Sequence, residues 1–114
     1  MEQPIAVIGA GIAGLAAAEA LRDAGRSVEV FDKARGPGGR MATRRDESDA
    51  FDHGAQYFTA REPAFAAQVE AWTQAGVVAE WTGRFGRLAG RFIAEKPARP
   101  RYVGTPRMSA LTRH

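Results

Sequence analysis

Cysteine is absent from this 114-residue sequence, which excludes disulfide frameworks and thiolate metal sites, and we expect no metal site of any kind. Long apolar segments are missing as well. The uncharged run Gln3–Ala18 is shorter than the roughly 20 residues of a membrane span, contains three glycines and follows no Lys or Arg. These features exclude a signal peptide and a spanning helix, so we expect a cytoplasmic protein with no membrane partner.

Acidic residues are scarce near the end of the chain. Residues 84–114 carry eight bases and one acid, so the net charge of +3 arises in this segment. The interleaved aromatics Phe85, Phe92 and Tyr102 could indicate binding of single-stranded nucleic acid. No recognised nucleic-acid module frames them, however, and positive charge would equally attract a phosphorylated substrate. We therefore expect a small-molecule substrate and no nucleic-acid partner.

The first 32 residues predict a compact β-α-β unit. Pro4–Ile8 is a short apolar run that ends before a glycine, which is typical of a fully buried strand in a parallel sheet. Apolar residues at helical spacing follow, and Gly25 is placed to end that helix. Val28–Asp32 then alternates in the manner of a second strand.

A glycine triplet lies where the predicted strand meets the predicted helix. Gly9, Gly11 and Gly14 form G-x-G-x-x-G, in which the first glycine permits a tight turn and the second lets a pyrophosphate approach. The third lets helix and strand pack closely. Free N–H groups around Ile12 and Ala13 would favour a phosphate anion at the helix start. The pattern predicts a dinucleotide site.

An acidic residue completes this pattern. Asp32 ends the second predicted strand 18 residues after Gly14, where the fingerprint has a carboxylate that accepts hydrogen bonds from ribose. The alternative is an ordinary glycine-containing turn with a solvated aspartate. The coincidence of strand, triplet, helix and acid favours the dinucleotide site.

A second glycine motif indicates a flavin rather than a nicotinamide cofactor. Gly38, Gly39 and Arg40 follow Asp32 within eight residues, a spacing that looks like the extended dinucleotide motif of amine oxidase and renalase flavoproteins. A glycine pair lets the loop fold back over a cofactor while the guanidinium reaches its phosphates. A flexible Arg-Gly loop is the alternative.

The middle of the chain predicts a loop and then a helix. Lys33–Asp52 is rich in Gly, Pro, Arg and Asp, which indicates a long and functional loop, and Phe51–Phe58 predicts a short strand. Thr59 and Glu62 predict a capping box, with Pro63 in the first turn of the helix that follows.

The last part predicts strands. Val77–Ile93 is broken by glycines in a way typical of antiparallel hairpins, and Arg101–Gly104 predicts a further strand. Either Thr105 or Ser109 is expected to cap a last helix.

The stretches Asp32–Arg45 and Asp52–Thr59 resemble bacterial renalase-type FAD-dependent oxidoreductases, within the wider flavin amine oxidase group. The resemblance continues through Trp72–Val77 and Arg101–His114, and so covers the whole chain but only the opening part of a complete family member. We therefore expect a truncated chain.

This resemblance implies an α/β fold with an incomplete sheet. Residues 1–60 would form a Rossmann-like FAD-binding segment, and residues 61–104 the start of an inserted antiparallel substrate domain. Residues 105–114 would begin a helix that the chain end interrupts.

The resemblance also implies the chemistry. The cofactor would be FAD, and the reaction would oxidise 2- and 6-dihydro isomers of NAD(P)H to NAD(P)+, with O2 as acceptor giving H2O2. Carried onto this sequence, the residues that would bind FAD are Gly9, Gly11, Ile12, Ala13, Gly14, Asp32, Lys33, Gly39, Arg40, Met41, Gly54, Ala55, Gln56 and Tyr57.

No catalytic residue is named, because hydride transfer to a flavin needs positioning and exclusion of water more than a protein acid or base. His53 is a candidate proton carrier, although a structural histidine is the stronger interpretation. Trp72, Trp81 and Phe85 could stack on a nicotinamide, although packing is the stronger interpretation for each.

Two other classes stay open. The chain could be part of another FAD-dependent oxidoreductase, such as an amine oxidase or a desaturase, since these enzymes share both glycine motifs. It could also be a noncatalytic dinucleotide-binding fragment, because one β-α-β unit leaves a parallel sheet short of strands. The stretch Asp52–Thr59 favours the renalase type over the first alternative.

Overall fold

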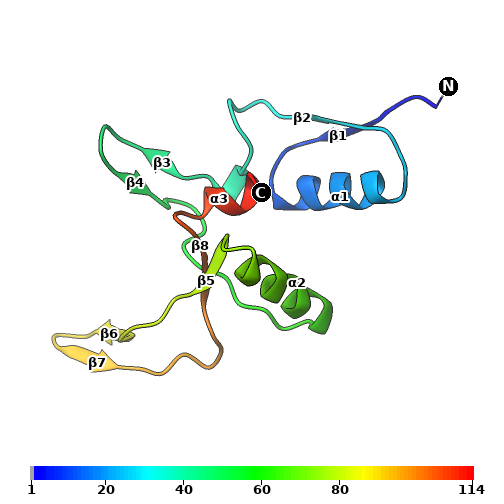
Figure 1. Cartoon of the computed structure of the whole chain (residues 1–114). Helices are drawn as coiled ribbons and strands as arrows, with labels where there is room; N and C mark the ends of the chain where they lie inside the picture. The colour runs from blue at the N-terminus through cyan, green and yellow to red at the C-terminus, as the bar shows by residue number, and fades with distance from the viewer. Residues whose placement is uncertain (1) are drawn as a thin grey trace.

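The N-terminal part of the chain forms the predicted β-α-β unit. In the computed structural model, which describes residues 2–114, strand β1 (Ile5–Ile8) leads into helix α1 (Ile12–Asp23) and then strand β2 (Val28–Phe31). The two strands pair in parallel, with Ile5 opposite Val28. Figure 1 shows α1 lying along one side of this strand pair. The prediction of this unit from apolar spacing is confirmed.

The prediction that the first strand is fully buried is wrong. Ile8 is 82% exposed and Phe31 50% exposed, and no residue of α1 is buried. The reason is that β1 and β2 form a sheet of only two strands within the described residues, so no further strand or helix covers their apolar side chains. An open groove of about 870 Å³ also runs between α1 and the two later helices. The fold is α/β with partial sheets.

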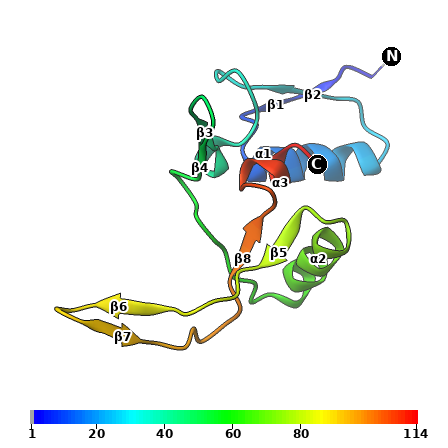
Figure 2. The same ribbon diagram turned by 60° about the vertical axis from the view of Figure 1, so that its left-hand side comes forward.

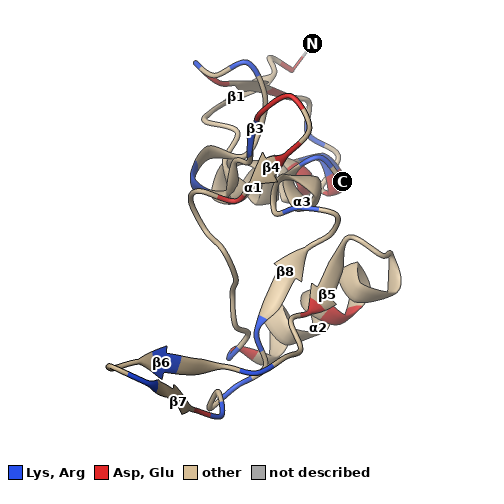
Figure 3. Ribbon diagram, turned by 90° about the vertical axis from the view of Figure 1, so that its left-hand side faces the viewer, with Lys and Arg blue, Asp and Glu red and all other residues tan. Residues whose placement is uncertain are grey.

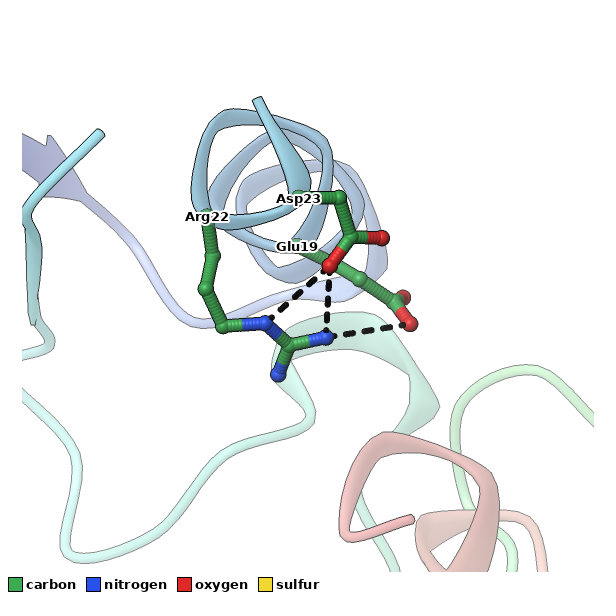
Figure 4. Close-up of polar contacts among 3 residues, drawn as sticks. All are labelled: Glu19, Arg22 and Asp23. Carbon is green, nitrogen blue, oxygen red and sulfur yellow. Dashed lines mark hydrogen bonds and ion pairs between the residues drawn. The ribbon is translucent and has the colours of Figure 1, made fainter. Parts of the chain in front are cut away.

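The end of α1 carries the ion pairs drawn in Figure 4. Arg22 donates to the Asp23 carboxylate at 3.1 and 3.2 Å, and its guanidinium lies 3.8 Å from Glu19. All three side chains are mostly exposed, so solvent screens the pairs and their contribution to stability is small. Gly25 follows with a φ of +79°, the left-handed conformation that suits glycine after a helix.

The long loop after β2 contains only short elements. A 3-10 turn, η1 (Gly39–Met41), precedes a small antiparallel pair made by β3 (Arg44–Arg45) and β4 (Ala50–Phe51). The expected strand near Phe51–Phe58 is limited to the end of β4 and a single bridge from Phe58 to a later strand.

Helix α2 spans Pro63–Gln74, with proline at its first position as predicted. Its N-cap is Glu62, and no side chain caps it. The predicted capping box is therefore wrong: the helix begins after Glu62, which leaves Thr59 too far upstream to reach the first-turn amides. Val69 is buried on the inner face of the helix.

The remaining strands form two antiparallel pairs. β6 (Gly86–Leu88) and β7 (Phe92–Ala94) make a hairpin, as predicted. β5 (Val78–Glu80), which precedes the hairpin in the sequence, pairs with β8 (Tyr102–Gly104), which follows it. Figures 1 and 2 show the β6–β7 hairpin projecting from the body as an arm. The radius of gyration is accordingly 16.9 Å, against about 13 Å for a compact chain of this length.

A small core joins the middle and the end of the chain. Val69 of α2, Val78 of β5 and Leu111 of the last helix are buried together. Partly buried side chains pack around them: Met41, Phe58, Ala60, Trp72, Val77 and Tyr102. Trp72 therefore packs in this core, which agrees with the structural interpretation of that residue.

The last helix is capped by side chains from a distant loop. Helix α3 spans Ser109–Thr112. The Asp52 carboxylate accepts from the Met108 N–H at 3.1 and 3.2 Å, and the Thr43 hydroxyl accepts from the Ser109 N–H at 3.2 Å. The same hydroxyl donates to Asp52 at 2.7 Å, so the two caps support each other.

The predicted caps of this helix are wrong. The Thr105 hydroxyl donates to the Gly76 carbonyl oxygen at 2.8 Å, 29 residues away, and the Ser109 side chain does not cap the helix. Asp52 and Thr43 take that place because the fold brings the loop after β2 against the chain end. Their contacts fasten the C-terminal segment to the N-terminal unit.

We predict that Asp52→Ala lowers the free energy of unfolding by about 1–3 kcal/mol, because it leaves partly buried N–H and hydroxyl donors without an acceptor. Urea denaturation followed by circular dichroism measures the change. Asp46→Ala is the matched control, since that exposed carboxylate accepts from the adjacent Glu47 N–H. Equal destabilisation by the two substitutions would contradict the role given to Asp52.

Candidate dinucleotide-binding site

The turn between β1 and α1 depends on two of the three fingerprint glycines for its shape. Gly9 has a φ of +103°, and its N–H donates to the Phe31 carbonyl oxygen at 2.7 Å. A Cβ added to Gly14 would collide with the Gly9 carbonyl oxygen. Gly9 thus makes the turn, and Gly14 lets helix and turn touch.

Gly11 leaves the helix start open. It is the N-cap of α1, and a Cβ added there would meet no atom within 4 Å. No side chain caps the helix and no acidic residue occupies its first turn. The N–H groups of Ile12, Ala13 and Gly14 have no acceptor within the helix, and together with the helix dipole they favour an anion.

Asp32 follows β2 directly and is held by two backbone amides. The Ala10 N–H donates to one carboxylate oxygen at 2.7 Å, and the Ala34 N–H donates to the other at 2.7 Å. The Ala10 N–H is the first cause that holds the pKa of Asp32 below its ordinary value, followed by the Ala34 N–H; desolvation opposes them and the charge of Lys33 adds to them. The carboxylate is therefore ionised and fixed beside the glycine turn.

The Gly-Gly-Arg loop lies on the same turn. The Gly38 N–H donates to the Ala10 carbonyl oxygen at 2.9 Å, and Gly38 is bridged to Gly11. A Cβ added to Gly39 would lie 3.3 Å from the Gly11 Cα. The glycine pair thus allows the loop to close onto the turn. Arg40 is exposed and forms no ion pair with any residue from 2 to 114.

The later predicted site residues divide into two groups. The Ala55 N–H donates to the Arg40 carbonyl oxygen at 2.9 Å, and a Cβ added to Gly54 would collide with that oxygen, so both adjoin the Gly-Gly-Arg loop. Tyr57 instead contacts Trp81 and Arg101, in a separate aromatic cluster.

Of the three other predicted residues, Met41 belongs to the Gly-Gly-Arg loop, because its N–H donates to the Gly38 carbonyl oxygen at 2.9 Å. Lys33 and Gln56 are exposed, and Met41 packs against the core. His53 is exposed, and its backbone N–H donates to the Phe51 carbonyl oxygen at 3.0 Å.

Sequence reasoning missed Ala10 and Ala34, which act through backbone amides. Alanine gives no chemical signal, and Ala10 is one of the variable positions of the fingerprint. Its place between two glycines, opposite the end of the second strand, is the signal that could have identified it. Within residues 2–114 no three His, Asp or Glu side chains gather in a way that could hold a metal, and none of the described helices has the length and apolar character needed to cross a bilayer.

Replacing two neighbouring glycines should separate binding from folding. We predict that Gly11→Ala folds normally, because its φ of −75° suits alanine, but binds ADP at least about tenfold more weakly, because the methyl group occupies the approach to the amides. Gly14→Ala should instead lower the free energy of unfolding by about 1–3 kcal/mol, because its added methyl group would overlap the Gly9 carbonyl oxygen. Calorimetric titration with ADP measures the affinity, and urea denaturation measures the free energy of unfolding. Unchanged ADP affinity in Gly11→Ala would exclude a phosphate at this turn.

The pKa of Asp32 gives a second prediction. Because that pKa is lowered in the folded chain, the stability contributed by the carboxylate is fully present above the ordinary value of 3.8 and is lost as pH falls through the lower native value. A carbon-detected NMR titration should give the Asp32 carboxyl a pKa below 3.8. A pKa of Asp32 at or above 3.8 would contradict the two amide contacts.

Comparison with known proteins agrees with this geometry. The profile of the family described as NAD(P)-binding Rossmann-like domain matches residues 7–71, which include the end of β1, all of α1 and β2, and the Gly-Gly-Arg loop. The 4,4'-diapophytoene desaturases (4,4'-diaponeurosporene-forming) of Staphylococcus aureus strains Newman and USA300 are each 46% identical over 50 residues, covering 44% of this chain and 10% of the relative.

Solved structures of putrescine oxidase match a larger part of the chain. The wild-type enzyme bound to putrescine is 30% identical, with a TM-score of 0.59 over 85% of this chain and 22% of that structure. A single mutant of putrescine oxidase is 33% identical, with a TM-score of 0.55 over 73% of this chain and 17% of that structure.

The chain thus spans about a tenth of the curated relatives and about a fifth of the solved structures it matches. The matching relatives are oxidoreductases by name, a desaturase and an oxidase. With a family profile that covers more than half of the sequence, and a β1–α1 turn whose geometry suits a dinucleotide, the chain belongs to the NAD(P)-binding Rossmann-like domain family and is related to flavin amine oxidases and desaturases.

Proposed function

We propose that the chain forms the adenosine- and pyrophosphate-binding part of a renalase-type oxidoreductase whose cofactor is FAD. The observation that carries this proposal is the fixed carboxylate of Asp32 beside the open N-terminus of α1, with the Gly-Gly-Arg loop closed onto the same turn. Glycine at position 14 lets α1 pack against the turn, and glycine at position 39 lets the Gly-Gly-Arg loop approach Gly11.

The turn binds the pyrophosphate of FAD. The first-turn amides of Ile12, Ala13 and Gly14 donate to its oxygens, and the missing side chain at Gly11 lets the phosphates come close. The exposed guanidinium of Arg40 supplies a further donor for the phosphate region.

Asp32 binds the adenosine ribose. Each carboxylate oxygen accepts one backbone N–H and keeps a lone pair for a ribose hydroxyl. The lowered pKa keeps both oxygens as acceptors at neutral pH. Gly54 and Ala55, which adjoin Arg40, continue the site toward the flavin ring, with Gln56 and Tyr57 beyond them. Lys33 and Met41 flank the ribose and phosphate regions.

FAD, when bound, accepts a hydride, and the protein positions the reactants and excludes water. The substrate of the proposed reaction is a 2- or 6-dihydro isomer of NAD(P)H. It loses a hydride and becomes NAD(P)+; the two electrons pass to O2, which takes up two protons and gives H2O2. We propose that residues 1–60 serve the cofactor and that residues 61–104 belong to the substrate domain, while residues 105–114 contribute helix α3.

Two alternatives have specific support. An amine substrate is favoured by the likeness to putrescine oxidase, which extends over 85% of this chain. A noncatalytic dinucleotide-binding piece is favoured by the exposed apolar side chains of β1 and β2, such as Ile8.

One preparation separates these functions. We predict that the purified 114-residue chain retains flavin absorbance, and that it produces peroxide under air when 2- or 6-dihydro-NAD(P) is added. The Gly11→Ala variant, prepared in parallel, should lose the flavin. Peroxide formed with putrescine instead would assign the chain to the amine oxidases. Bound flavin without turnover would reject the renalase activity for this chain, and absence of flavin from the wild type would favour the noncatalytic piece.

A further inference from the structure

A second pocket lies at the base of the β6–β7 arm, built from residues other than those of the β1–α1 turn. Its volume is about 420 Å³, and its walls are the segment leaving β5 and the segment returning to β8. Figures 1 and 2 show these two segments connecting the β6–β7 arm to the body. The volume falls within the roughly 300–1,000 Å³ typical of small-molecule sites.

Two aromatic rings form the apolar part of this pocket. Trp81 and Phe85 meet edge to face, with ring centroids 5.3 Å apart and an interplanar angle of 80°. Trp81 is 43% exposed, so part of the indole is free to contact a ligand. Exposed aromatic surface in a concave site favours stacking of a planar ring.

Arg101 is held beside these rings in a fixed orientation. Its guanidinium lies 4.7 Å from the centre of the Phe85 ring and 4.6 Å from that of Tyr57. The Arg101 carbonyl oxygen accepts from the backbone N–H of Trp81 at 2.7 Å, so a hydrogen bond joins the two segments that form the walls of the pocket. A stacked guanidinium keeps the N–H donors along its edge available, in the planar arrangement that suits phosphate oxygens.

The charge of the pocket is uncompensated. Lys96 and Arg99 line it together with Arg101, and Glu80 is the one acidic residue among its lining residues. None of these four forms an ion pair with any residue that the structure describes. On the arm itself Arg87 pairs with Glu95 at 2.7 Å. Figure 3 shows basic residues on the arm and at its base, in addition to those in the N-terminal part of the chain.

We propose that this pocket binds a planar aromatic ring joined to a phosphate, as in a mononucleotide. The ring stacks on the exposed indole of Trp81, which meets the Phe85 ring edge to face, and Arg101 donates to the phosphate while Lys96 and Arg99 add positive charge. The volume suits one such unit, whereas a nucleic-acid strand needs a continuous track of such sites. If the proposed oxidoreductase function holds, the pocket receives the phosphate-bearing end of the dinucleotide substrate, and only this link rests on that function.

Tryptophan fluorescence reports this site directly. The chain has two tryptophans, so Trp72→Phe leaves Trp81 as the only indole. We predict saturable quenching by AMP in that variant, with adenosine alone and inorganic phosphate alone binding at least about tenfold more weakly, because each makes only half of the contacts. Equal affinity for AMP and adenosine would overturn the role of the cations.

Three further substitutions, each made in the Trp72→Phe variant, test whether AMP binds in this pocket. Arg101→Gln and Lys96→Gln should each weaken AMP binding several-fold or more, and the exposed Lys96 lies outside the aromatic cluster, so its loss does not disturb the fold. Arg91→Gln, on the β6–β7 arm and outside the pocket lining, should leave AMP binding unchanged. An equal loss in Arg91→Gln would show general charge attraction instead of a site.

A fourth variant separates this inference from the proposed function. Quenching of Trp81 by AMP should persist in Gly11→Ala, whose β1–α1 turn is blocked. If the chain with Gly11 intact binds no flavin but AMP still quenches Trp81, the proposed function is rejected and the pocket stands. Loss of the quenching in Gly11→Ala would assign the AMP signal to the β1–α1 turn. Tighter binding of an oligonucleotide than of AMP at physiological salt would assign the pocket to nucleic acid.

Discussion

The carboxylate of Asp32 connects the parts of the N-terminal unit. One oxygen accepts a hydrogen bond from the Ala10 N–H, which follows β1, and the other accepts one from the Ala34 N–H, which follows β2. Because the ends of the two strands are joined in this way, the start of α1 and the start of the long loop have fixed positions relative to each other. The Gly38 N–H then bonds the Ala10 carbonyl oxygen, so the same residue that holds the acid also holds the Gly-Gly-Arg loop.

A series of backbone contacts extends from this point through the chain. The Arg40 carbonyl oxygen accepts from Ala55, and Asp52 and Thr43 hold the first amides of α3. Leu111 of that helix enters the core with Val69 and Val78. The candidate cofactor site and the small core are therefore linked by the loop between them. Neither β1 nor α1 contributes a buried side chain to that core, so this loop is their connection to it.

Local signals predicted the elements and the turn, and long-range contacts escaped prediction. The glycine triplet and the alternation of Val28–Asp32 identified the β-α-β unit because both report local structure. Gly9 adopts the positive φ of a tight turn, and alternating side chains are typical of a strand. The pairing of β5 with β8 and the capping of α3 by Asp52 join residues far apart, and no spacing in the sequence encodes them. The burial expected for Pro4–Ile8 failed because burial depends on neighbouring strands, of which the described chain supplies only one.

We infer that an anion binds at the N-terminus of α1 beside Asp32. Backbone amide NMR shifts during titration with ADP test it most directly, because the proposed donors are themselves the observed groups. We expect saturable shifts that are largest at Ile12, Ala13 and Gly14, with a smaller shift at Ala10, whose N–H already donates to Asp32. Shifts confined to the β6–β7 arm, or no saturable shift in the first turn of α1, would contradict it.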